Sequence, residues 1–207
     1  MSIAAVVLDI GNVLIEWQPE RFYDREIGEA RRREMFDAVD LHAMNDRVDL
    51  GEPFREVIYE TAEAHPAFRD EIRMWHDRWI EMAQPVIAPS VTLMERLQSR
   101  GVPVFALSNF GVESFAYAQT QYDFLHSFDR PYISGHLRMA KPDPAIFAHV
   151  EETSGIAPVN LLFTDDRADN IAAAKARGWS THLFDGPQVW AARLVAEGLL
   201  TIEEARQ

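Results

Sequence analysis

Short uninterrupted apolar runs alternate with amphipathic segments over most of the chain. Residues 3–8 form the first run and include three β-branched side chains, which is typical of a parallel strand buried on both faces. Apolar runs predict further strands at residues 102–107, 132–133, 161–164 and 181–184. Helical spacing of apolar positions predicts helices at residues 91–99, 112–119, 144–153 and 168–177. This alternation predicts an α/β fold with a parallel sheet and right-handed crossovers.

Residues 19–85 follow a different pattern, with apolar side chains at helical spacing. Ile72, Trp75 and Trp79 are three and four residues apart, as on one face of a helix. The run Asp-Leu-Gly-Glu-Pro at residues 49–53 is typical of a turn between helices. We therefore predict a bundle of three to five helices. Because a crossover between neighbouring strands is usually far shorter, we interpret this bundle as an insertion.

The insertion divides the chain into two predicted domains. One consists of residues 1–18 together with residues 86–207, and the other of residues 19–85. The tail, residues 189–207, is predicted to be helical, because Thr201-Ile202-Glu203-Glu204 resembles a helix start.

The composition is that of a globular protein with an acidic balance. The chain has 207 residues, 47% of them hydrophobic, and a formal net charge of −13, which argues against non-specific binding to nucleic acid or to anionic membranes. It contains no cysteine, so disulfides and thiolate metal sites are excluded. No signal-like segment begins the chain, and no apolar run approaches the roughly 18 residues of a transmembrane helix. We therefore expect a cytoplasmic protein.

Polar side chains follow the predicted strands at the edge where parallel sheets bind ligands. The residues at this edge are Asp9, Ser108, Asn109, Asp165 and Asp166. A carboxylate in the position of Asp9 can attack phosphorus and form an aspartyl phosphate, and the hydroxyl and amide can bind phosphate oxygens. Taken singly, each residue is also an ordinary strand-end turn or helix N-cap. The interpretation therefore depends on the edge that they share.

The charges at this edge point to a phosphate and a metal ion. Lys141, in a loop before a predicted helix, can neutralise charge on both a phosphate and the attacking carboxylate. Three neighbouring carboxylates repel one another unless a cation lies between them, and Mg²⁺ prefers such oxygen ligands. Asp169 begins a helix, where it is either a simple first-turn acid or a group that orients Lys141 or a metal-bound water.

With these residues the chain resembles the haloacid dehalogenase-like (HAD) hydrolase superfamily over its whole length. The matching stretches are residues 9–13, 107–109, 141–147 and 163–170. The resemblance implies a Rossmann-like three-layer core with a helical cap inserted after the first stretch. It implies that Asp9 is the nucleophile and Lys141 the charge stabiliser of a phosphatase. It also implies that substrate is bound by Gly11, Asn12, Ser108, Asn109 and Lys141, and Mg²⁺ by Asp9, the backbone carbonyl of Gly11, Asp165 and Asp166.

At Gly11 the chain departs from most phosphatases of this superfamily. They carry a second Asp there, which protonates the leaving oxygen and later activates water, whereas a glycine only lets backbone amides approach an anion closely. The pattern Asp-x-Gly-Asn-Val is similar to that of a subgroup of sugar-phosphate phosphatases acting on glucose 1-phosphate. An anomeric hydroxyl is more acidic than an ordinary alcohol, so it needs less proton assistance to leave. Glu16, His42 and Asp46 are open candidates for a substitute acid.

The residues leave three functions open. The first is a Mg²⁺-dependent phosphatase of a small phosphorylated metabolite. The second is a metal-independent 2-haloacid dehalogenase, in which Asp9 attacks carbon and halide leaves without an acid. The acids at 165 and 166 argue against it, because that chemistry has no use for a metal. The third is a weakly active regulatory protein, because Gly11 lacks the acid. The candidates for lining the pocket are Trp17, Phe22, His42, Asn45 and Arg47, while Trp75 and Trp79 are interpreted as core.

Overall fold

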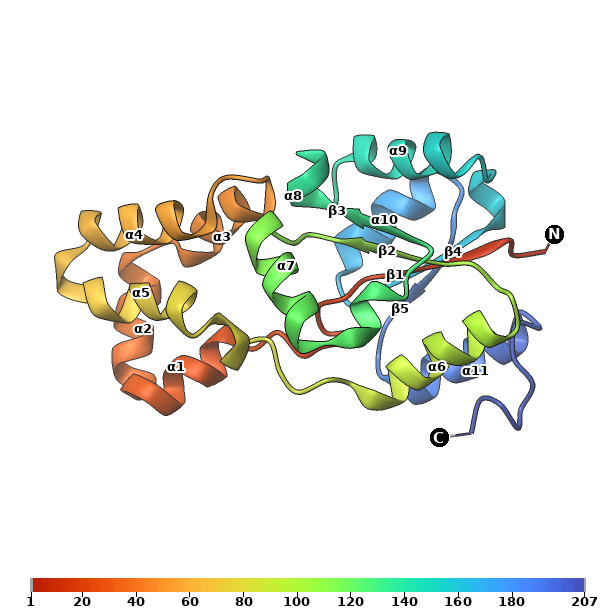
Figure 1. The fold of residues 1–207 in the computed structure, drawn as a ribbon, viewed down its shortest axis with the longest axis horizontal. Helices are drawn as coiled ribbons and strands as arrows, with labels where there is room; N and C mark the ends of the chain where they lie inside the picture. The colour runs from red at the N-terminus through yellow and green to blue at the C-terminus, as the bar shows by residue number, and fades with distance from the viewer. Residues whose placement is uncertain (1, 207) are drawn as a thin grey trace.

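Five parallel strands form a single sheet. The computed structural model describes residues 2–206, and Figure 1 shows the sheet within the larger part of the molecule. The strands are β1 (Ala5–Leu8), β2 (Val104–Ser108), β3 (Arg130–Ile133), β4 (Leu161–Asp165) and β5 (Ser180–Leu183). Their order in the sheet is β3-β2-β1-β4-β5, and every neighbouring pair is parallel. The predicted α/β fold with a parallel sheet is confirmed.

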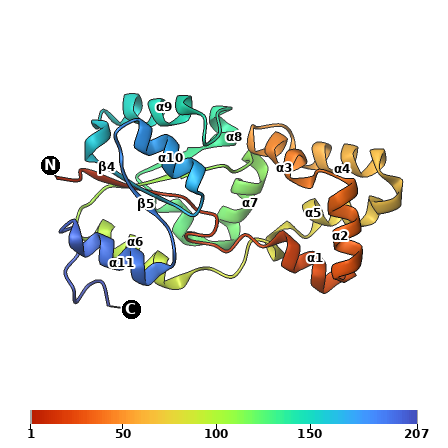
Figure 2. The ribbon, with the colours of Figure 1, turned by 180° about the vertical axis from the view of Figure 1, so that it is seen from behind.

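Helices cover both faces of this sheet, as Figures 1 and 2 show from opposite sides. They are α6 (Ala88–Ser99), α7 (Val112–Gln121), α8 (Ser134–Leu137), α9 (Pro144–Ser154), α10 (Ala168–Ala176) and α11 (Pro187–Ala196). Successive side chains of a strand point to opposite faces. Val6 and Leu8 accordingly share one apolar cluster with α6, α7 and α11, whereas Ala5 and Val7 share another with α9 and α10. The predicted three-layer core is therefore present.

Five further helices separate β1 from α6 and form a bundle at one end of the sheet (Figure 1). They are α1 (Pro19–Ile27), α2 (Glu29–Ala38), α3 (Leu41–Asp49), α4 (Phe54–Ala64) and α5 (Arg69–Asp77). Trp75 and Trp79 are 0% and 5% exposed, which confirms that they belong to the core. The predicted helical insertion, residues 19–85, is thus present. Its division from residues 1–18 and 86–207 as a separate domain stays a prediction, and residues 1 and 207 lie outside the described part.

Short 3-10 turns supplement the helices. They occur at Pro66–Phe68, Trp79–Glu81, Asp123–His126 and Pro158–Asn160. The longest α-helix, α6, has 12 residues, and no helix within residues 2–206 is long and apolar enough to cross a membrane. The cytoplasmic location stays a prediction.

The C-terminal tail differs from the prediction of a helix over residues 189–207. That prediction is wrong beyond Ala196, where α11 ends. Thr201 and Glu204 do exchange the expected capping hydrogen bonds. However, the backbone carbonyl of Glu204 accepts a hydrogen bond from Arg96 of α6. The tail therefore forms turns that are tied to α6 rather than a second helix.

Candidate active site

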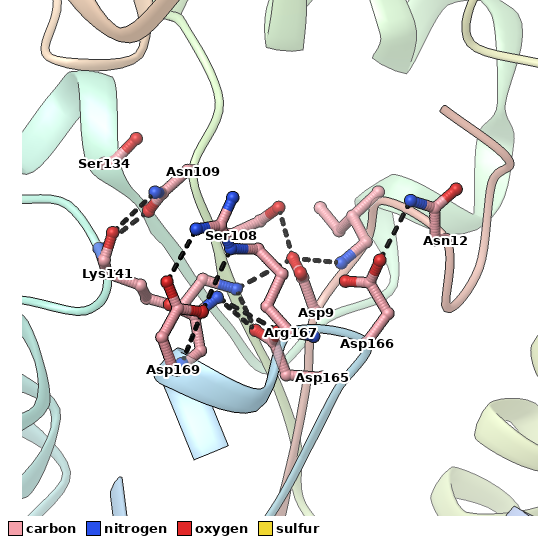
Figure 3. A network of polar contacts seen from close by, with 12 residues as sticks. Asp9, Asn12, Ser108, Asn109, Ser134, Lys141, Asp165, Asp166, Arg167 and Asp169 are labelled. Atoms are coloured by element: carbon pink, nitrogen blue, oxygen red, sulfur yellow. Dashed lines mark hydrogen bonds and ion pairs between the residues drawn. The ribbon is translucent and has the colours of Figure 1, made fainter. Parts of the chain in front are cut away.

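The carboxyl ends of β1, β2 and β4 meet, and each brings one predicted site residue (Figure 3). β2 and β4 each run one residue further than predicted, so Ser108 and Asp165 are the last residues of their strands. Asp9 follows β1, and its backbone N–H donates to the carbonyl of Thr164 in β4 over 3.0 Å. The shared edge predicted from the sequence therefore exists.

Asp9 is buried, and three donors converge on one of its oxygens. Its Oδ1 accepts hydrogen bonds from the Ser108 hydroxyl and from the Ile10 backbone N–H, each at 2.7 Å, and lies 3.0 Å from Lys141 Nζ. Within residues 2–206 no group donates a hydrogen bond to Oδ2. Burial raises the pKa of Asp9 to about 7 against the opposing charge of Lys141, and Asp165 adds to the rise. The carboxyl group is thus held in one orientation with one oxygen left for a new bond.

Lys141 is a buried cation between two carboxylates. Its Nζ lies 3.0 Å from Asp9 Oδ1 and 2.6 Å from Asp165 Oδ2. Asn109 fixes its backbone, because the Asn109 amide donates to the Lys141 carbonyl at 2.9 Å and accepts from the Lys141 N–H at 2.8 Å. Burial acts to lower the pKa of Lys141, but Asp9 and Asp165 outweigh it and raise the pKa above its ordinary value. Lys141 is therefore a fixed positive charge beside Asp9.

The two acids at the end of β4 have different surroundings. Besides its ion pair with the lysine, the fully buried Asp165 accepts hydrogen bonds from Asn170 Nδ2, at 3.0 Å to each oxygen, and from the Arg167 N–H at 2.8 Å. Asp166 is half-buried, and its Oδ2 accepts a hydrogen bond from Asn12 Nδ2 at 3.0 Å. Asn170 was not among the predicted site residues, although its place five residues after Asp165, in the first turn of α10, directs it to the same edge.

The acidic residues at this edge form a donor set that fits Mg²⁺. Asp9, Asp165 and Asp166 each have a carboxylate oxygen within 4.8 Å of those of the other two. Lys141 contacts Asp9 and Asp165 but supplies only one positive charge. Oxygen donors with an excess of negative charge are what Mg²⁺ prefers.

Asn12 and Asn109 have side chains that contact protein groups. Asn12 has a φ of 54°, and its side chain bridges the carboxylate of Asp166 and the backbone N–H of Trp17. Asn109 holds the backbone of Lys141. Binding of phosphate by these residues and by Gly11 stays a prediction.

The interpretation that Asp169 orients Lys141 is wrong, whereas the orientation of a metal-bound water by Asp169 stays a prediction. Asp169 pairs with Arg167 at 2.6 Å, and the hydrogen bond from Arg167 lowers the pKa of Asp169. Lys141 is instead oriented by Asp165.

A cavity of about 320 Å³ lies over the site, which is at the lower end of the volumes of small-molecule sites. Its aromatic lining comes from Trp17, Trp75, Trp79 and Phe110. Among residues 1–50, its polar lining comes from Asp9, Asn12, Glu16, His42, Asn45, Asp46 and Asp49. The two tryptophans of the insertion core therefore also form part of the cavity wall.

Three of the five predicted lining residues reach this cavity. Trp17, His42 and Asn45 line it. The prediction is wrong for Phe22, which is 2% exposed and packs in the core. It is also wrong for Arg47, which pairs with Glu52 and Glu60 on the surface.

Asp49, the last residue of α3, is a cavity-lining acid that was predicted only as part of a turn. Asn45 Nδ2 donates a hydrogen bond to its Oδ2 at 3.0 Å. Burial raises the pKa of Asp49 to about 7, with further contributions from the negative charges of Asp46 and Asp9. The spacing of Asn45, Asp46 and Asp49, three and four residues apart, would have placed them on one helix face.

Known proteins are similar to this chain over most of its length. A family model described as haloacid dehalogenase-like hydrolase matches residues 3–178. The phosphatase MT3486 of Mycobacterium tuberculosis is 27% identical, and the match covers 89% of this chain and 88% of that protein. The sesquiterpene phosphatase astK of Aspergillus oryzae is 22% identical, with 87% and 90% covered. Drimenol cyclase drtB of Aspergillus calidoustus is 22% identical over 88% of the chain, and the chain spans only 34% of its length.

Solved structures share the fold. The HAD family enzyme bt-2542 of Bacteroides thetaiotaomicron, in complex with magnesium and inorganic phosphate, matches with a TM-score of 0.65 and 25% identity, covering 89% of this chain and 96% of that one. The L-2-haloacid dehalogenase of Xanthobacter autotrophicus matches with a TM-score of 0.61 and 20% identity, covering 98% and 86%. The likeness to the dehalogenase is one of fold alone.

Proposed function

Because the chain belongs to the haloacid dehalogenase-like hydrolases, we propose that it is a magnesium-dependent phosphatase of a small phosphorylated metabolite. The observation that carries this proposal is the convergence of Ser108 and Lys141 on Asp9, beside two further carboxylates. Two relatives that match along most of their length are phosphatases, and a structural relative binds magnesium and phosphate. These observations support phosphoryl transfer more than dehalogenation, which has no use for a metal ion.

In the proposed reaction, a carboxylate oxygen of Asp9 attacks phosphorus. The bond from phosphorus to the leaving oxygen breaks, its electron pair stays on that oxygen, and an aspartyl phosphate forms. Water then attacks phosphorus, the bond to Asp9 breaks, and inorganic phosphate leaves. Ser108 and Lys141 keep Asp9 in the attacking orientation. The charge of Lys141 also offsets the negative charge that develops on the transferred group.

The residues that would hold Mg²⁺ are Asp9, Asp165 and Asp166, together with the backbone carbonyl of Gly11. When bound, the ion supplies positive charge that stabilises the phosphoryl group during transfer. Asp165 also orients Lys141 through their 2.6 Å ion pair.

A sugar phosphate such as glucose 1-phosphate is the substrate class that the cavity suits best. The cavity is small and combines aromatic walls, such as Trp17 and Trp75, with polar groups, such as His42 and Asn45. A sugar ring presents C–H groups to an aromatic face and hydroxyls to polar side chains. Gly11 leaves no acid two residues after Asp9, which favours a leaving group as acidic as an anomeric hydroxyl.

Phosphate release tests this proposal. Glucose 1-phosphate, glucose 6-phosphate and p-nitrophenyl phosphate are incubated with wild type and with Asp9→Asn, in Mg²⁺ or in EDTA. We expect metal-dependent turnover in wild type, none above background in Asp9→Asn, and a preference for glucose 1-phosphate over glucose 6-phosphate. Folded wild-type protein that releases no phosphate in Mg²⁺, but releases chloride from 2-chloropropionate in EDTA, would contradict it.

A further inference from the structure

An anomeric leaving group needs less proton assistance than an ordinary alcohol, but its oxygen still takes up a proton, which Gly11 cannot supply. Four titratable side chains from residues 16–49 line the cavity beside those at the sheet edge: Glu16, His42, Asp46 and Asp49. Glu16 is paired with Arg21 at 2.8 Å. The side chain of His42 is 64% exposed, and Asp46 is also exposed. Asp49 is the half-buried member of this group without a cationic partner among residues 2–206, so its protonation is not committed to an ion pair.

Asp49 is held in place by a chain of hydrogen bonds. The indole N–H of Trp75, which is fully buried, donates to Asn45 Oδ1 at 3.0 Å. The amide of Asn45 then donates to Asp49 Oδ2 at 3.0 Å. Because both ends of the Asn45 amide are engaged, the carboxyl group of Asp49 has a fixed orientation in the cavity wall.

The C-terminal end of α3, which carries Asp49, lies directly against the core. The backbone carbonyl of Asp49 accepts a hydrogen bond from the Ser134 hydroxyl of α8 at 2.5 Å, and Figure 1 shows α3 beside α7 and α8. A Cβ at Gly111 would lie 2.5 Å from Val48 Cγ1, and one at Gly51 would lie 2.5 Å from a core backbone oxygen. Because α3 packs this closely against the core, Asp49 is fixed in position relative to Asp9.

We propose that Asp49 is the general acid and base of this site, an assignment that rests on the proposed phosphatase function. In the first step its carboxyl proton passes to the leaving oxygen as the bond from phosphorus to that oxygen breaks, giving the alcohol. In the second step the Asp49 carboxylate takes a proton from the water that attacks the aspartyl phosphate. Asp49 returns to its protonated form, and Asp9 returns to its carboxylate.

The surroundings of Asp49 suit this cycle. Burial and the charges of Asp46 on α3 and Asp9 on the sheet edge raise the pKa of Asp49 to about 7, against the Gly111 N–H and Lys141, which lower it. An acid–base group works best when its pKa lies near the working pH. Near neutral pH, Asp49 can therefore both give and take a proton.

Two aryl esters of similar shape test the first step. Phenyl phosphate needs protonation of its leaving group, whereas p-nitrophenyl phosphate does not. In Asp49→Asn we expect kcat/KM for phenyl phosphate to fall roughly 10²–10⁴-fold and that for p-nitrophenyl phosphate to fall less than about tenfold. Equal falls for the two esters, or no fall for phenyl phosphate, would overturn the assignment.

Pre-steady-state kinetics test the second step. If Asp49 also activates water, Asp49→Asn accumulates the aspartyl phosphate, and p-nitrophenol appears as a burst of about one equivalent followed by slow turnover. Linear release of p-nitrophenol at a reduced rate, with no burst, would argue against the role as base.

Asp46→Asn is the matched control, because it makes the same change three residues earlier on α3. Asp46 raises the pKa of Asp49 but does not itself give the proton, so we expect Asp46→Asn to move the ratio of the two kcat/KM values far less than Asp49→Asn does. If Asp46→Asn shifts this ratio as much as Asp49→Asn does, the loss of any negative charge from the cavity wall slows phenyl phosphate hydrolysis selectively. That result would overturn the assignment.

The pH profile of the wild-type enzyme gives a second test that requires no folded variant. As the pH rises above about 7, Asp49 loses its proton, so we expect kcat/KM for phenyl phosphate to fall by about tenfold per pH unit while that for p-nitrophenyl phosphate falls less. Identical profiles for the two esters would contradict the assignment. Folded wild-type protein that releases phosphate neither from these esters nor from glucose 1-phosphate would instead remove the phosphatase function itself, so the two failures are distinguishable.

Discussion

At the scale of single residues, Lys141 supplies the positive charge that offsets the buried carboxylates of Asp9 and Asp165. It is 4% exposed and contacts two carboxylates. In Lys141→Met these carboxylates stay buried without a counter-charge, and we expect a loss of about 3–5 kcal/mol of stability in EDTA. Mg²⁺ binds the folded state and offsets part of this loss, so it should raise the melting temperature more in the variant than in wild type.

The control for this prediction is Lys175, the only other lysine of the chain, which is exposed. Lys175→Met should change the stability by no more than about 0.5 kcal/mol. A melting temperature of Lys141→Met in EDTA equal to that of wild type would contradict the charge argument.

Residues at the ends of strands could be predicted because their position in the chain fixes where they lie. Asp9, Ser108 and Asp165 follow from the rule that parallel strands end at a common edge. Asp49 could not be predicted in this way. It lies on a helix of the insertion, and only the packing of that helix against the core brings it to the cavity.

At the scale of elements, the contact between α3 and the start of α7 positions Asp49. In Gly111→Ala the new Cβ would lie 2.5 Å from Val48 Cγ1 and 2.9 Å from Ser114 Oγ, which displaces α3 from the core. We expect kcat/KM for phenyl phosphate to fall about tenfold or more, because catalysis is sensitive to displacements of about 1 Å. Adding Val48→Ala makes room for the Cβ and should recover part of the loss. Additive losses in the double variant would contradict this explanation.

A second element contact joins α9 to the segment after α10. Glu151 accepts hydrogen bonds from Arg177 at 2.7 Å and from Trp179 Nε1 at 2.8 Å. We expect Glu151→Gln to lose about 1–3 kcal/mol in urea unfolding at pH 7. Glu152→Gln, at the exposed neighbouring position, should lose almost nothing.

The same contact predicts a pH dependence. The hydrogen bond from Arg177 lowers the pKa of Glu151 in the folded state, so its stabilisation is fully present above the unfolded value of about 4.3 and is lost as the pH falls through the lower, folded value. The stability difference between wild type and Glu151→Gln should therefore shrink below about pH 4. A difference that stays constant down to pH 3 would show that the charge of Glu151 contributes nothing.

The five strands and the helices α6, α7, α9 and α10 were predictable from apolar periodicity, usually within two or three residues at each end, whereas the four-residue helix α8 was not predicted. The tail was not, because the capping pattern at Thr201 forms locally while Arg96 of α6 donates hydrogen bonds to the backbone carbonyls of Glu204 and Arg206. A local pattern does not reveal such a competing contact.

At the scale of the whole molecule, the sheet and the helical insertion both contribute to one cavity. The sheet edge supplies Asp9, Lys141 and the acids of β4, and the insertion supplies aromatic walls and Asp49. The sheet, the helical insertion and the polar residues of the sheet edge could be predicted from the sequence. The mutual placement of the sheet and the insertion could not, because it depends on close backbone approaches at Gly51 and Gly111.

The central claim is that Asp9 is the nucleophile of a phosphatase. The most direct measurement is acid quenching of the enzyme during turnover of p-nitrophenyl phosphate in Mg²⁺, followed by mass spectrometry of the peptide that contains Asp9. We expect this peptide to carry one phosphate in wild type, more of it in Asp49→Asn, and none in Asp9→Asn. Phosphate release by Asp9→Asn at the wild-type rate, with no phosphorylated peptide in either protein, would contradict the claim.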